Sequence, residues 1–198
     1  MNRRSISAAM NTLSVLNQQQ LNKITRGGAS IFLSFGELIE SESFYHNEDG
    51  KLAKSSNGNP LRKKKMVGKY ALHFNCSMRL TYGDKVAFTK SDVFRPNLKL
   101  ANDPNFDLES FDWDNLGKNY FDEMVSKYIG NEPRGFIVES LIVSKFGDLK
   151  ISFKNDFVLE LFTDCSSGDE SWRFFEVGSD KLHFVMLGSG IQDEDDED

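Results

Sequence analysis

Tyr70-Ala71-Leu72-His73-Phe74-Asn75-Cys76-Ser77-Met78-Arg79-Leu80 alternates strictly between two kinds of side chain. A period of two predicts a β-strand with one face in the core and the other toward solvent. The apolar face comprises Tyr70, Leu72, Phe74, Cys76, Met78 and Leu80. The opposite face carries four hydrogen-bonding residues, His73, Asn75, Ser77 and Arg79. The stretch therefore predicts both a core strand and a candidate binding surface.

A hairpin follows this strand at Tyr82-Gly83-Asp84-Lys85. Gly83 at the first central position suits a two-residue type II′ turn. The hairpin is expected to span residues 70–94, with Leu72, Phe74, Met78 and Leu80 buried. Pairing across the turn places Arg79 opposite Phe88, Ser77 opposite Lys90 and Asn75 opposite Asp92. Asp92 is therefore expected to join the polar face.

Five apolar segments in the last third of the chain predict an antiparallel meander, because only short turn-like breaks separate them. They are Phe136–Phe146, Leu149–Phe153, Phe157–Phe162, Trp172–Val177 and Leu182–Leu187. One main helix is expected before them, capped by Asp112 or Asp114 and carrying apolar residues from Leu116 to Tyr128. A weaker helical stripe runs from Leu13 to Ile24, and a strand is expected at 29–35.

These elements predict an α+β fold, mostly antiparallel sheet, with one main helix packed on one face. Residues 1–192 are expected to form one domain with an exposed loop at about 41–68. The segments Phe32–Glu40 and Ile151–Glu160 resemble each other, which raises the hypothesis of two similar halves. The final six residues, Asp193–Asp198, are all acidic and predict a disordered tail.

Charge and cysteine content narrow the classes of function. The net charge is −6, but without the last six residues the chain carries 24 acidic and 24 basic residues. Nucleic-acid binding is therefore disfavoured, and the basic run Arg62–Lys65 is interpreted as part of a solvated loop. Cys76 and Cys165 do not have the spacing of a metal-binding or redox motif. They are expected to be free thiols, and the protein is therefore expected in the reducing cytoplasm. No apolar run has the length of about 20 residues that a membrane span needs.

The polar face, His73, Asn75, Ser77, Arg79 and Asp92, is the best candidate site, weighed against an ordinary solvated sheet face. A Ser77–His73 catalytic pair is disfavoured, since positions i and i+4 on a strand lie roughly 13 Å apart. His46, His73 and His183 have no metal-ligand spacing, and no glycine-rich phosphate loop precedes a helix. No catalytic residue, metal or cofactor is therefore expected.

Trp172-Arg173-Phe174-Phe175 is an unusually aromatic segment. Trp and Arg are common at the energetic centres of protein interfaces, so Trp172 and Arg173 are candidate binding residues. Alternation along a strand instead predicts a core position for at least two of the three aromatic residues.

Several segments together resemble a family of uncharacterised bacterial proteins. They are Ala71-Leu72-His73, Cys76, Arg79-Leu80, Asp92-Val93-Phe94, Gly147-Asp148-Leu149, Leu161–Asp164 and Trp172–Phe175. The resemblance spans about residues 24–175 and departs from the family pattern at Met78, where a tryptophan is expected. It implies a bacterial origin, one domain and no assigned reaction.

Two hypotheses of function follow from these observations. The first is a non-catalytic protein-binding module, such as an immunity protein that sequesters a toxin partner. The alternative is a small-molecule-binding or enzymatic domain that uses the polar face, with Arg79 and Asp92 converging on a ligand. The oligomeric state is left open.

Overall fold

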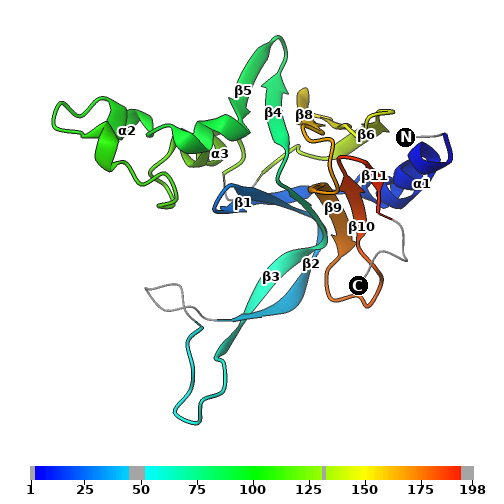
Figure 1. Ribbon diagram of the computed structural model, residues 1–198, viewed down its shortest axis with the longest axis horizontal. Coiled ribbons are helices and arrows are strands. Elements are labelled where there is room, and N and C mark those ends of the chain that lie inside the picture. The colour runs from blue at the N-terminus through cyan, green and yellow to red at the C-terminus, as the bar shows by residue number, and fades with distance from the viewer. Residues whose placement is uncertain (1–2, 45–51, 131–132, 193–198) are drawn as a thin grey trace.

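The computed structural model describes residues 3–44, 52–130 and 133–192. It confirms an α+β fold with two antiparallel sheets (Figure 1). The first sheet has the order β1 (Leu21–Gly27), β2 (Ser30–Phe44), β3 (Arg62–Phe74), β9 (Glu170–Glu176), β10 (Phe184–Leu187) and β11 (Gly190–Ile191). The second has the order β5 (Lys85–Thr89), β4 (Ser77–Tyr82), β8 (Phe157–Phe162), β7 (Leu149–Phe153) and β6 (Val138–Val143).

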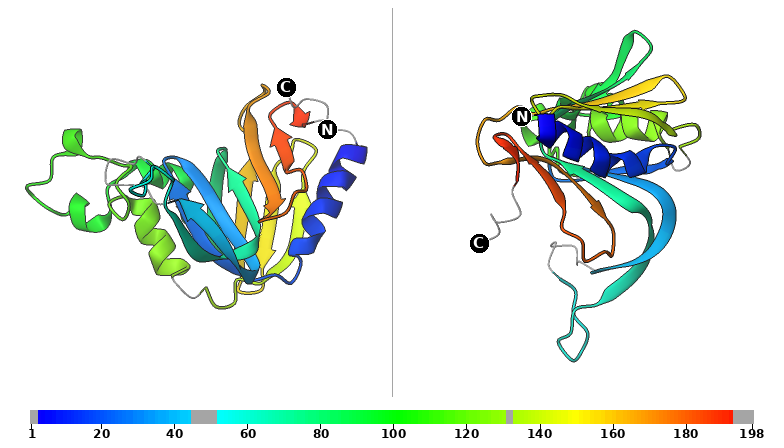
Figure 2. Two further views of the ribbon diagram at one scale, coloured as in Figure 1. Left: turned by 90° about the horizontal axis from the view of Figure 1, so that it is seen from below. Right: turned by 90° about the vertical axis from the view of Figure 1, so that its right-hand side faces the viewer.

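Two connections of the chain link the sheets (Figure 2). The chain passes from β3 in the first sheet to β4 in the second, and it returns from β8 to β9. β3 pairs with β9, and β4 pairs with β8. The stretch predicted as one continuous strand is thus divided at Asn75 and Cys76, whose backbone N–H groups both donate to the carbonyl of Ser171. Phe74, Cys76 and Met78 are nevertheless all buried, so the alternation continues across the bend.

On the opposite side of the sandwich, hydrogen bonds connect the edge strands β1 and β6 of the two sheets. Leu21 N–H donates to the Phe136 carbonyl at 2.8 Å, and Val138 N–H donates to the Gln19 carbonyl at 2.9 Å. These bonds join the start of β1 to the start of β6. They satisfy backbone groups that an open sheet edge would leave unpaired.

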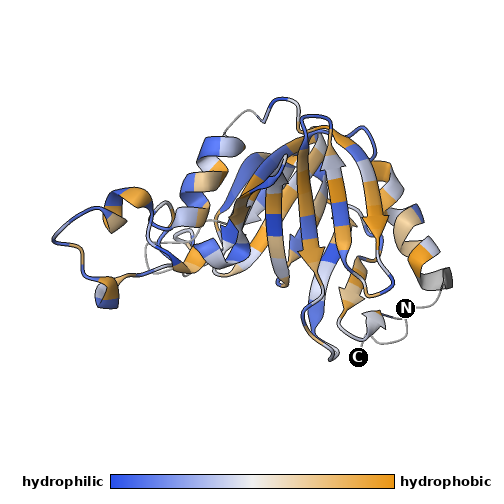
Figure 3. Cartoon of the chain, turned by 90° about the horizontal axis from the view of Figure 1, so that it is seen from above, coloured by the Kyte–Doolittle hydropathy of each residue, from blue (hydrophilic) through white to orange (hydrophobic). Residues whose placement is uncertain are grey.

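The apolar faces of both sheets form one hydrophobic cluster, and polar residues alternate with apolar ones along the strands (Figure 3). Leu72, Phe74, Met78 and Leu80 are buried, as predicted. Trp172 is fully buried, and its indole Nε1–H donates to the Gly147 carbonyl at 2.8 Å. Burial of each large apolar side chain contributes about 1.5 to 3 kcal/mol, which fixes the strand register strongly.

Two helices lie at opposite ends of the sandwich (Figure 1). α1 (Arg3–Leu13) leads into the 3₁₀ turn η1 (Ser14–Leu16) and packs against β6. α3 (Tyr120–Tyr128) packs against β5 and the 3₁₀ helix η2 (Lys90–Phe94), where the rings of Phe121 and Phe88 meet edge to face at 5.3 Å. Within the described part of the chain, no helix is long and apolar enough to cross a membrane.

The predicted turn at Gly83-Asp84 is confirmed, with Gly83 at φ 56°. The predicted register is wrong by one residue: Arg79 lies opposite Thr89, and Leu80 lies opposite Phe88. The cause is a bulge that leaves Ala87 without a partner residue. Because η2 begins at Lys90, the pairs Ser77–Lys90 and Asn75–Asp92 do not form, and Asp92 lies off the strand.

Both helix predictions are displaced along the chain. Asn119, not Asp112 or Asp114, caps α3, since its Oδ1 accepts the N–H of Asp122 at 2.8 Å. Leu116 precedes α3 and is 68% exposed. Near the N-terminus the helix ends at Leu13, whereas Leu21 and Ile24 belong to β1.

Part of the region predicted as a loop at 41–68 is strand, whereas residues 52–61 form no strand. β2 continues to Phe44 and pairs with β3, so Arg62–Lys65 forms part of a hairpin. Cross-strand ion pairs support it: Glu42 lies 2.8 Å from Arg62, and Glu40 lies 2.8 Å from Lys64. Residues 45–51, which include His46, and the tail 193–198 lie outside the described residues.

The first three segments of the predicted meander are confirmed as β6, β7 and β8, and in β7 Leu149, Ile151 and Phe153 are buried. The last two segments instead form β9 and β10 in the first sheet. The two similar segments differ in conformation: Phe32–Glu40 lies within the single strand β2, whereas Ile151–Glu160 crosses the turn between β7 and β8.

Candidate functional site

His73 and Arg173 are opposite residues on β3 and β9 and share one carboxylate. His73 Nδ1 lies 3.0 Å from Glu170 Oε1, and Arg173 Nε donates to both carboxylate oxygens of Glu170 at 2.8 Å. Burial alone would raise the pKa of Glu170, but the hydrogen bonds and charges of Arg173 and His73 outweigh it and lower the pKa. The Phe32 ring stacks on His73 at 4.5 Å. The Glu170 carboxylate therefore takes its hydrogen bonds from His73 and Arg173 within the protein.

Asn75 and Ser77 flank the bend between the sheets. Asn75 Oδ1 accepts a hydrogen bond from Ser30 Oγ at 2.5 Å. Ser77 Oγ donates to Asp164 Oδ2 at 2.5 Å, and the Ser77 N–H donates to the same oxygen at 2.8 Å. Ser77 and His73 therefore bond different carboxylates on different sheets, which does not form a nucleophile–base pair.

Arg79 and Asp92 also have separate partners, so the predicted convergence on one ligand is wrong. Arg79 Nε donates to Glu160 Oε2 at 2.6 Å on β8. Asp92 is buried, and its carboxylate accepts the N–H of Thr89 at 2.8 Å in the capping box of η2. The bulge in β5 and the start of η2 remove Asp92 from the polar face.

Trp172 belongs to the core, and so does Phe174, as alternation predicts. Trp172 is therefore not accessible to a binding partner. The Arg173 guanidinium donates hydrogen bonds to Glu170.

Cys76 lies at the bend, where the charges of Lys90 and Asp164 also act on its thiol. Burial raises the pKa of the Cys76 thiol to about 12, so it is protonated at neutral pH and a poor nucleophile. Lys90 Nζ donates to the Asn75 carbonyl, and burial lowers the pKa of Lys90. Among the residues that the structure describes, no three histidine, cysteine or acidic side chains converge as a metal site would require.

Two shallow cavities lie elsewhere on the surface. One of about 430 Å³ lies between α1 and β6, and one of about 530 Å³ lies beside the β4–β5 turn. Neither is lined by a residue of the predicted polar face.

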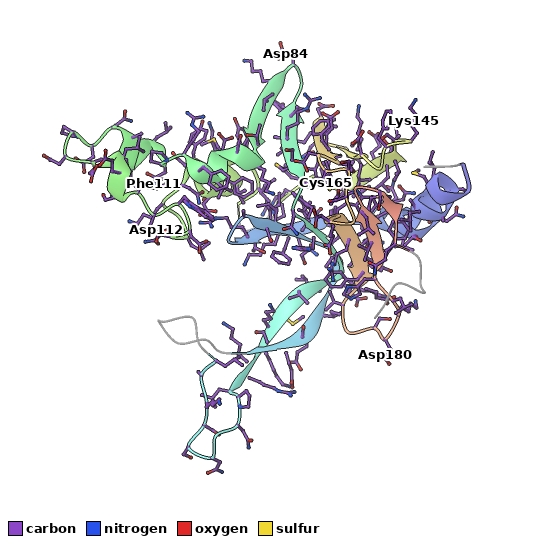
Figure 4. The ribbon with its side chains drawn as sticks, in the orientation of Figure 1. Asp84, Phe111, Asp112, Lys145, Cys165 and Asp180 are labelled. Atoms are coloured by element: carbon purple, nitrogen blue, oxygen red, sulfur yellow. The ribbon has the colours of Figure 1, made fainter. Side chains whose placement is uncertain are left out.

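The most distinctive surface is a long excursion between η2 and α3, residues 97–118, which we name the acidic lobe. It includes α2 (Leu98–Ala101) and the 3₁₀ turn η3 (Leu108–Ser110). Its base is closed where Asn97 N–H donates to the Lys118 carbonyl at 2.9 Å and Tyr120 N–H donates to the Arg95 carbonyl at 2.8 Å. The lobe projects to one side of the sandwich, and Phe111 and Asp112 lie on it (Figure 4).

The acidic lobe combines an excess of acidic residues, five against the two basic residues Lys99 and Lys118, with exposed apolar side chains. Between Lys99 and Lys118 the sequence contains five acidic residues and no basic residue: Asp103, Asp107, Glu109, Asp112 and Asp114. The exposed fractions are 50% for Leu98, 66% for Leu108 and 68% for Leu116. Phe94, at the base, is 52% exposed and meets the Trp113 ring at 5.0 Å.

Arg26 of β1 fastens the acidic lobe to the body. Its side chain is 1% exposed, and its guanidinium bonds both carboxylate oxygens of Asp122 at 2.9 and 3.0 Å. It also reaches Asp114 Oδ1 at 3.1 Å and the carbonyls of Trp113 and Asp114 at 3.2 Å. The planar fork of arginine suits such multiple bonding. These bonds therefore hold the C-terminal part of the lobe, at Trp113 and Asp114, against β1.

Asn119 completes this anchor. It is fully buried, and its Nδ2 donates to the Trp113 carbonyl at 2.9 Å while its Oδ1 caps α3. Sequence reasoning missed both Arg26 and Asn119. The available signal was the position of Arg26, which shares its strand face with the buried Ile24.

Comparison of the chain with family models, with curated proteins and with solved structures finds no match. The resemblance to a bacterial family stays a prediction.

Proposed function

We propose that the protein is a non-catalytic protein-binding module whose acidic lobe contacts a basic partner protein. An immunity protein that sequesters a toxin is the type of activity that fits best. The observation that carries the proposal is the projecting excursion with exposed leucines and five acidic residues, fastened at its base by Arg26.

The length of the excursion supports this role. Connections longer than about 12 to 15 residues with little secondary structure are uncommon in compact domains and are usually functional or disordered, and the lobe contains only the short α2 and η3. Here the base is locked by buried hydrogen bonds of Arg26 and Asn119. A preorganised surface loses less conformational entropy on binding than a mobile loop would.

The side chains on the lobe supply both affinity and partner choice. Burial of an exposed leucine against a partner contributes about 1.5 to 3 kcal/mol, so Leu98, Leu108 and Leu116 can form the apolar centre of an interface. The acidic residues would steer a basic surface toward the lobe and raise the association rate. The lobe therefore fits a basic protein better than an acidic or neutral one.

The polar clusters of the body favour binding over catalysis. His73, Ser77 and Arg79 each bond a different carboxylate, and the buried Cys76 thiol has a raised pKa. Among the described residues, these polar clusters contain no paired nucleophile and base.

The test is a comparative affinity capture from a lysate of the source organism, followed by calorimetry with the purified partner. The variant L108S/L116S removes two exposed lobe side chains, and the control I142S removes Ile142, which is 57% exposed on β6. A basic protein retained by the wild type and by I142S but lost with L108S/L116S is expected. Capture of no protein, or equal capture by all three, would contradict the proposal.

A further inference from the structure

The cavity beside the β4–β5 turn extends across four adjacent strands of the second sheet, β4, β8, β7 and β6. Its volume is about 530 Å³, which is within the range of known small-molecule sites. The residues that line it include Tyr82 of β4, Phe157 of β8, Ser152 of β7, Glu139 of β6 and Asp156 of the turn between β7 and β8. With about 4.8 Å between neighbouring strands, the cavity is roughly 14 Å long.

The two carboxylates of this cavity are not balanced by a basic side chain. No basic residue lines the cavity. Within the described part of the chain, neither Glu139 nor Asp156 makes an ion pair or a side-chain hydrogen bond. Lys85 and Lys154, which are close in sequence to the two turns, are exposed and do not line the cavity. A positively charged ligand would therefore supply the partner that the protein does not.

A β-bulge determines the position of Glu139. The pairing of β6 with β7 shifts between Val138 and Ser140, which leaves Glu139 without a partner residue on β7. Bulges change the direction of a side chain and are frequent next to functional sites. Glu139 is exposed, and it lines both this cavity and the one between α1 and β6. One end of the cavity thus presents an accessible, unpaired carboxylate.

The other end of the cavity is aromatic. Tyr82 is 51% exposed, and its ring stacks on Phe157 with the ring centroids 4.6 Å apart. Phe157 in turn contacts the rings of Phe136 at 4.8 Å and Tyr128 at 5.9 Å, which hold it in place. In the described structure no cationic side chain lies over the Tyr82 ring. Because the face of an aromatic ring attracts cations, this end also favours positive charge.

We propose that this cavity binds a linear aliphatic polyamine, with one ammonium group over the Tyr82 ring and others beside Asp156 and Glu139. Such a ligand carries several positive charges along a chain of methylene groups. It therefore matches a long cavity in which the ring and the two carboxylates come from β4, the β7–β8 turn and β6. The methylene groups between the charges would contact the apolar surface of Phe157 and Val158.

Other classes of ligand fit this cavity less well. An anion would meet two carboxylates and no basic residue. A metal ion prefers several ligating side chains at one point, and among the residues that the structure describes no three such side chains gather. A compact organic cation would reach only one end of the cavity.

No residue of the acidic lobe lines the cavity, so polyamine binding does not depend on the proposed protein partner. The test is calorimetry with spermidine at physiological ionic strength, together with an NMR titration that identifies the residues that respond. The variant E139Q/D156N removes both charges, and asparagine readily adopts the positive φ of 63° found at Asp156. The matched control E37Q/D180N removes two exposed carboxylates from outside the cavity.

We expect saturable binding of one spermidine molecule, with NMR shifts at residues 82–83, 139 and 152–158. E139Q/D156N should weaken binding about tenfold, since an exposed ion pair contributes about threefold for each carboxylate. The control should stay within about twofold of the wild type. Tyr82→Leu should weaken binding about threefold, whereas Tyr82→Phe keeps the ring and should retain the affinity. Butylamine, which has a single charge, should bind more weakly than spermidine.

Melting curves of each variant report folding, and the pair Tyr82→Leu and Tyr82→Phe replaces the double variant if that variant is unfolded. Absence of saturable binding, equal losses in the control, or NMR shifts confined to the acidic lobe or the tail would overturn the proposal. Butylamine or tetramethylammonium binding as tightly as spermidine would also overturn it, because the cavity would then not select an elongated cation. Displacement of spermidine by an equal concentration of magnesium would show that the carboxylates respond to charge alone and would contradict the proposal.

Discussion

Arg26 is the residue on which the position of the acidic lobe depends. A buried arginine is costly unless its donors are satisfied, and here carboxylates of Asp114 and Asp122 and three backbone carbonyls satisfy them. The exposed pair Arg79–Glu160 is a natural comparison, because 45% of the Arg79 side chain is accessible.

Arg26→Ala should lower the free energy of unfolding by about 3 to 5 kcal/mol, because Asp122 would lose its buried partner. Arg79→Ala should cost at most about 1 kcal/mol. Urea unfolding of both variants measures the difference. Arg26→Lys should recover only part of the loss, since lysine cannot reproduce the planar fork. Equal effects at the two arginines would contradict the anchoring role.

Cys76 gives a pH dependence of stability. Its pKa in the folded protein is raised by burial from an ordinary value of 9.0 to about 12, whereas the unfolded chain ionises near the ordinary value. Between these pH values the unfolded state is stabilised by ionisation, so this contribution to stability is complete below about pH 9 and is lost as pH rises toward 12.

The prediction is that the free energy of unfolding falls from pH 8 to pH 11 by a larger amount in the wild type than in Cys76→Ala. Denaturant unfolding at each pH measures it. Cys165→Ala is the control, because Cys165 is partly exposed and lies outside the core. An identical pH profile for wild type and Cys76→Ala would be inconsistent with the buried thiol.

At the scale of elements, the two-stranded ribbon of residues 38–44 and 62–68, here called the arm, depends on a bulge at its base. Gly36 and Glu37 lie opposite the single residue Lys69 between the pairs Phe35–Tyr70 and Leu38–Gly68. Gly68 N–H donates to Ser34 Oγ at 2.7 Å, and a Cβ at Gly68 would lie 2.5 Å from the Phe35 carbonyl oxygen. Backbone atoms cannot move aside as a flexible side chain can, so only glycine fits there.

Gly68→Ala should therefore lower stability by about 1 to 3 kcal/mol and loosen the arm. Gly27→Ala is the matched control, because a Cβ there meets only the Phe32 ring at an ordinary distance of 3.8 Å. Thermal unfolding and amide hydrogen exchange of residues 38–44 and 62–68 measure both effects. Unchanged exchange in Gly68→Ala would show that the bulge does not hold the arm.

For the whole molecule, the arrangement of the two sheets depends on two connections. The chain passes from the first sheet to the second between β3 and β4, and it returns between β8 and β9. They place the acidic lobe and the arm at different parts of the surface (Figure 1). The acidic tail 193–198 adds a further six negative charges to the chain.

Deletion of Asp193–Asp198 should leave the melting temperature nearly unchanged, because six adjacent acids cannot bury apolar area. It should lower the association rate with a basic partner at low salt and leave the dissociation rate almost unaltered. Calorimetry and stopped-flow binding measure the two effects. A large fall in melting temperature would mean that the tail stabilises the folded body.

The sequence by itself determined the class of fold and the core face of the central stretch. Alternation identified Leu72, Phe74, Met78 and Leu80 as buried, and Gly83-Asp84 as a turn, because these properties depend on local periodicity and backbone preference. The strands β6, β7 and β8 were predictable for the same reason.

Tertiary structure alone decided the register after the bulge at Ala87, the bend at Asn75 and Cys76, and the anchor at Arg26. Each depends on residues distant in sequence: Ser171 accepts the bonds at the bend, and Asp122 holds the arginine. The residues of the predicted polar face do not form one site for that reason. The fold brings each of these side chains to a different hydrogen-bond partner. Local periodicity reports which face a residue occupies, but the partner it meets there is set by packing between strands and helices far apart in the chain.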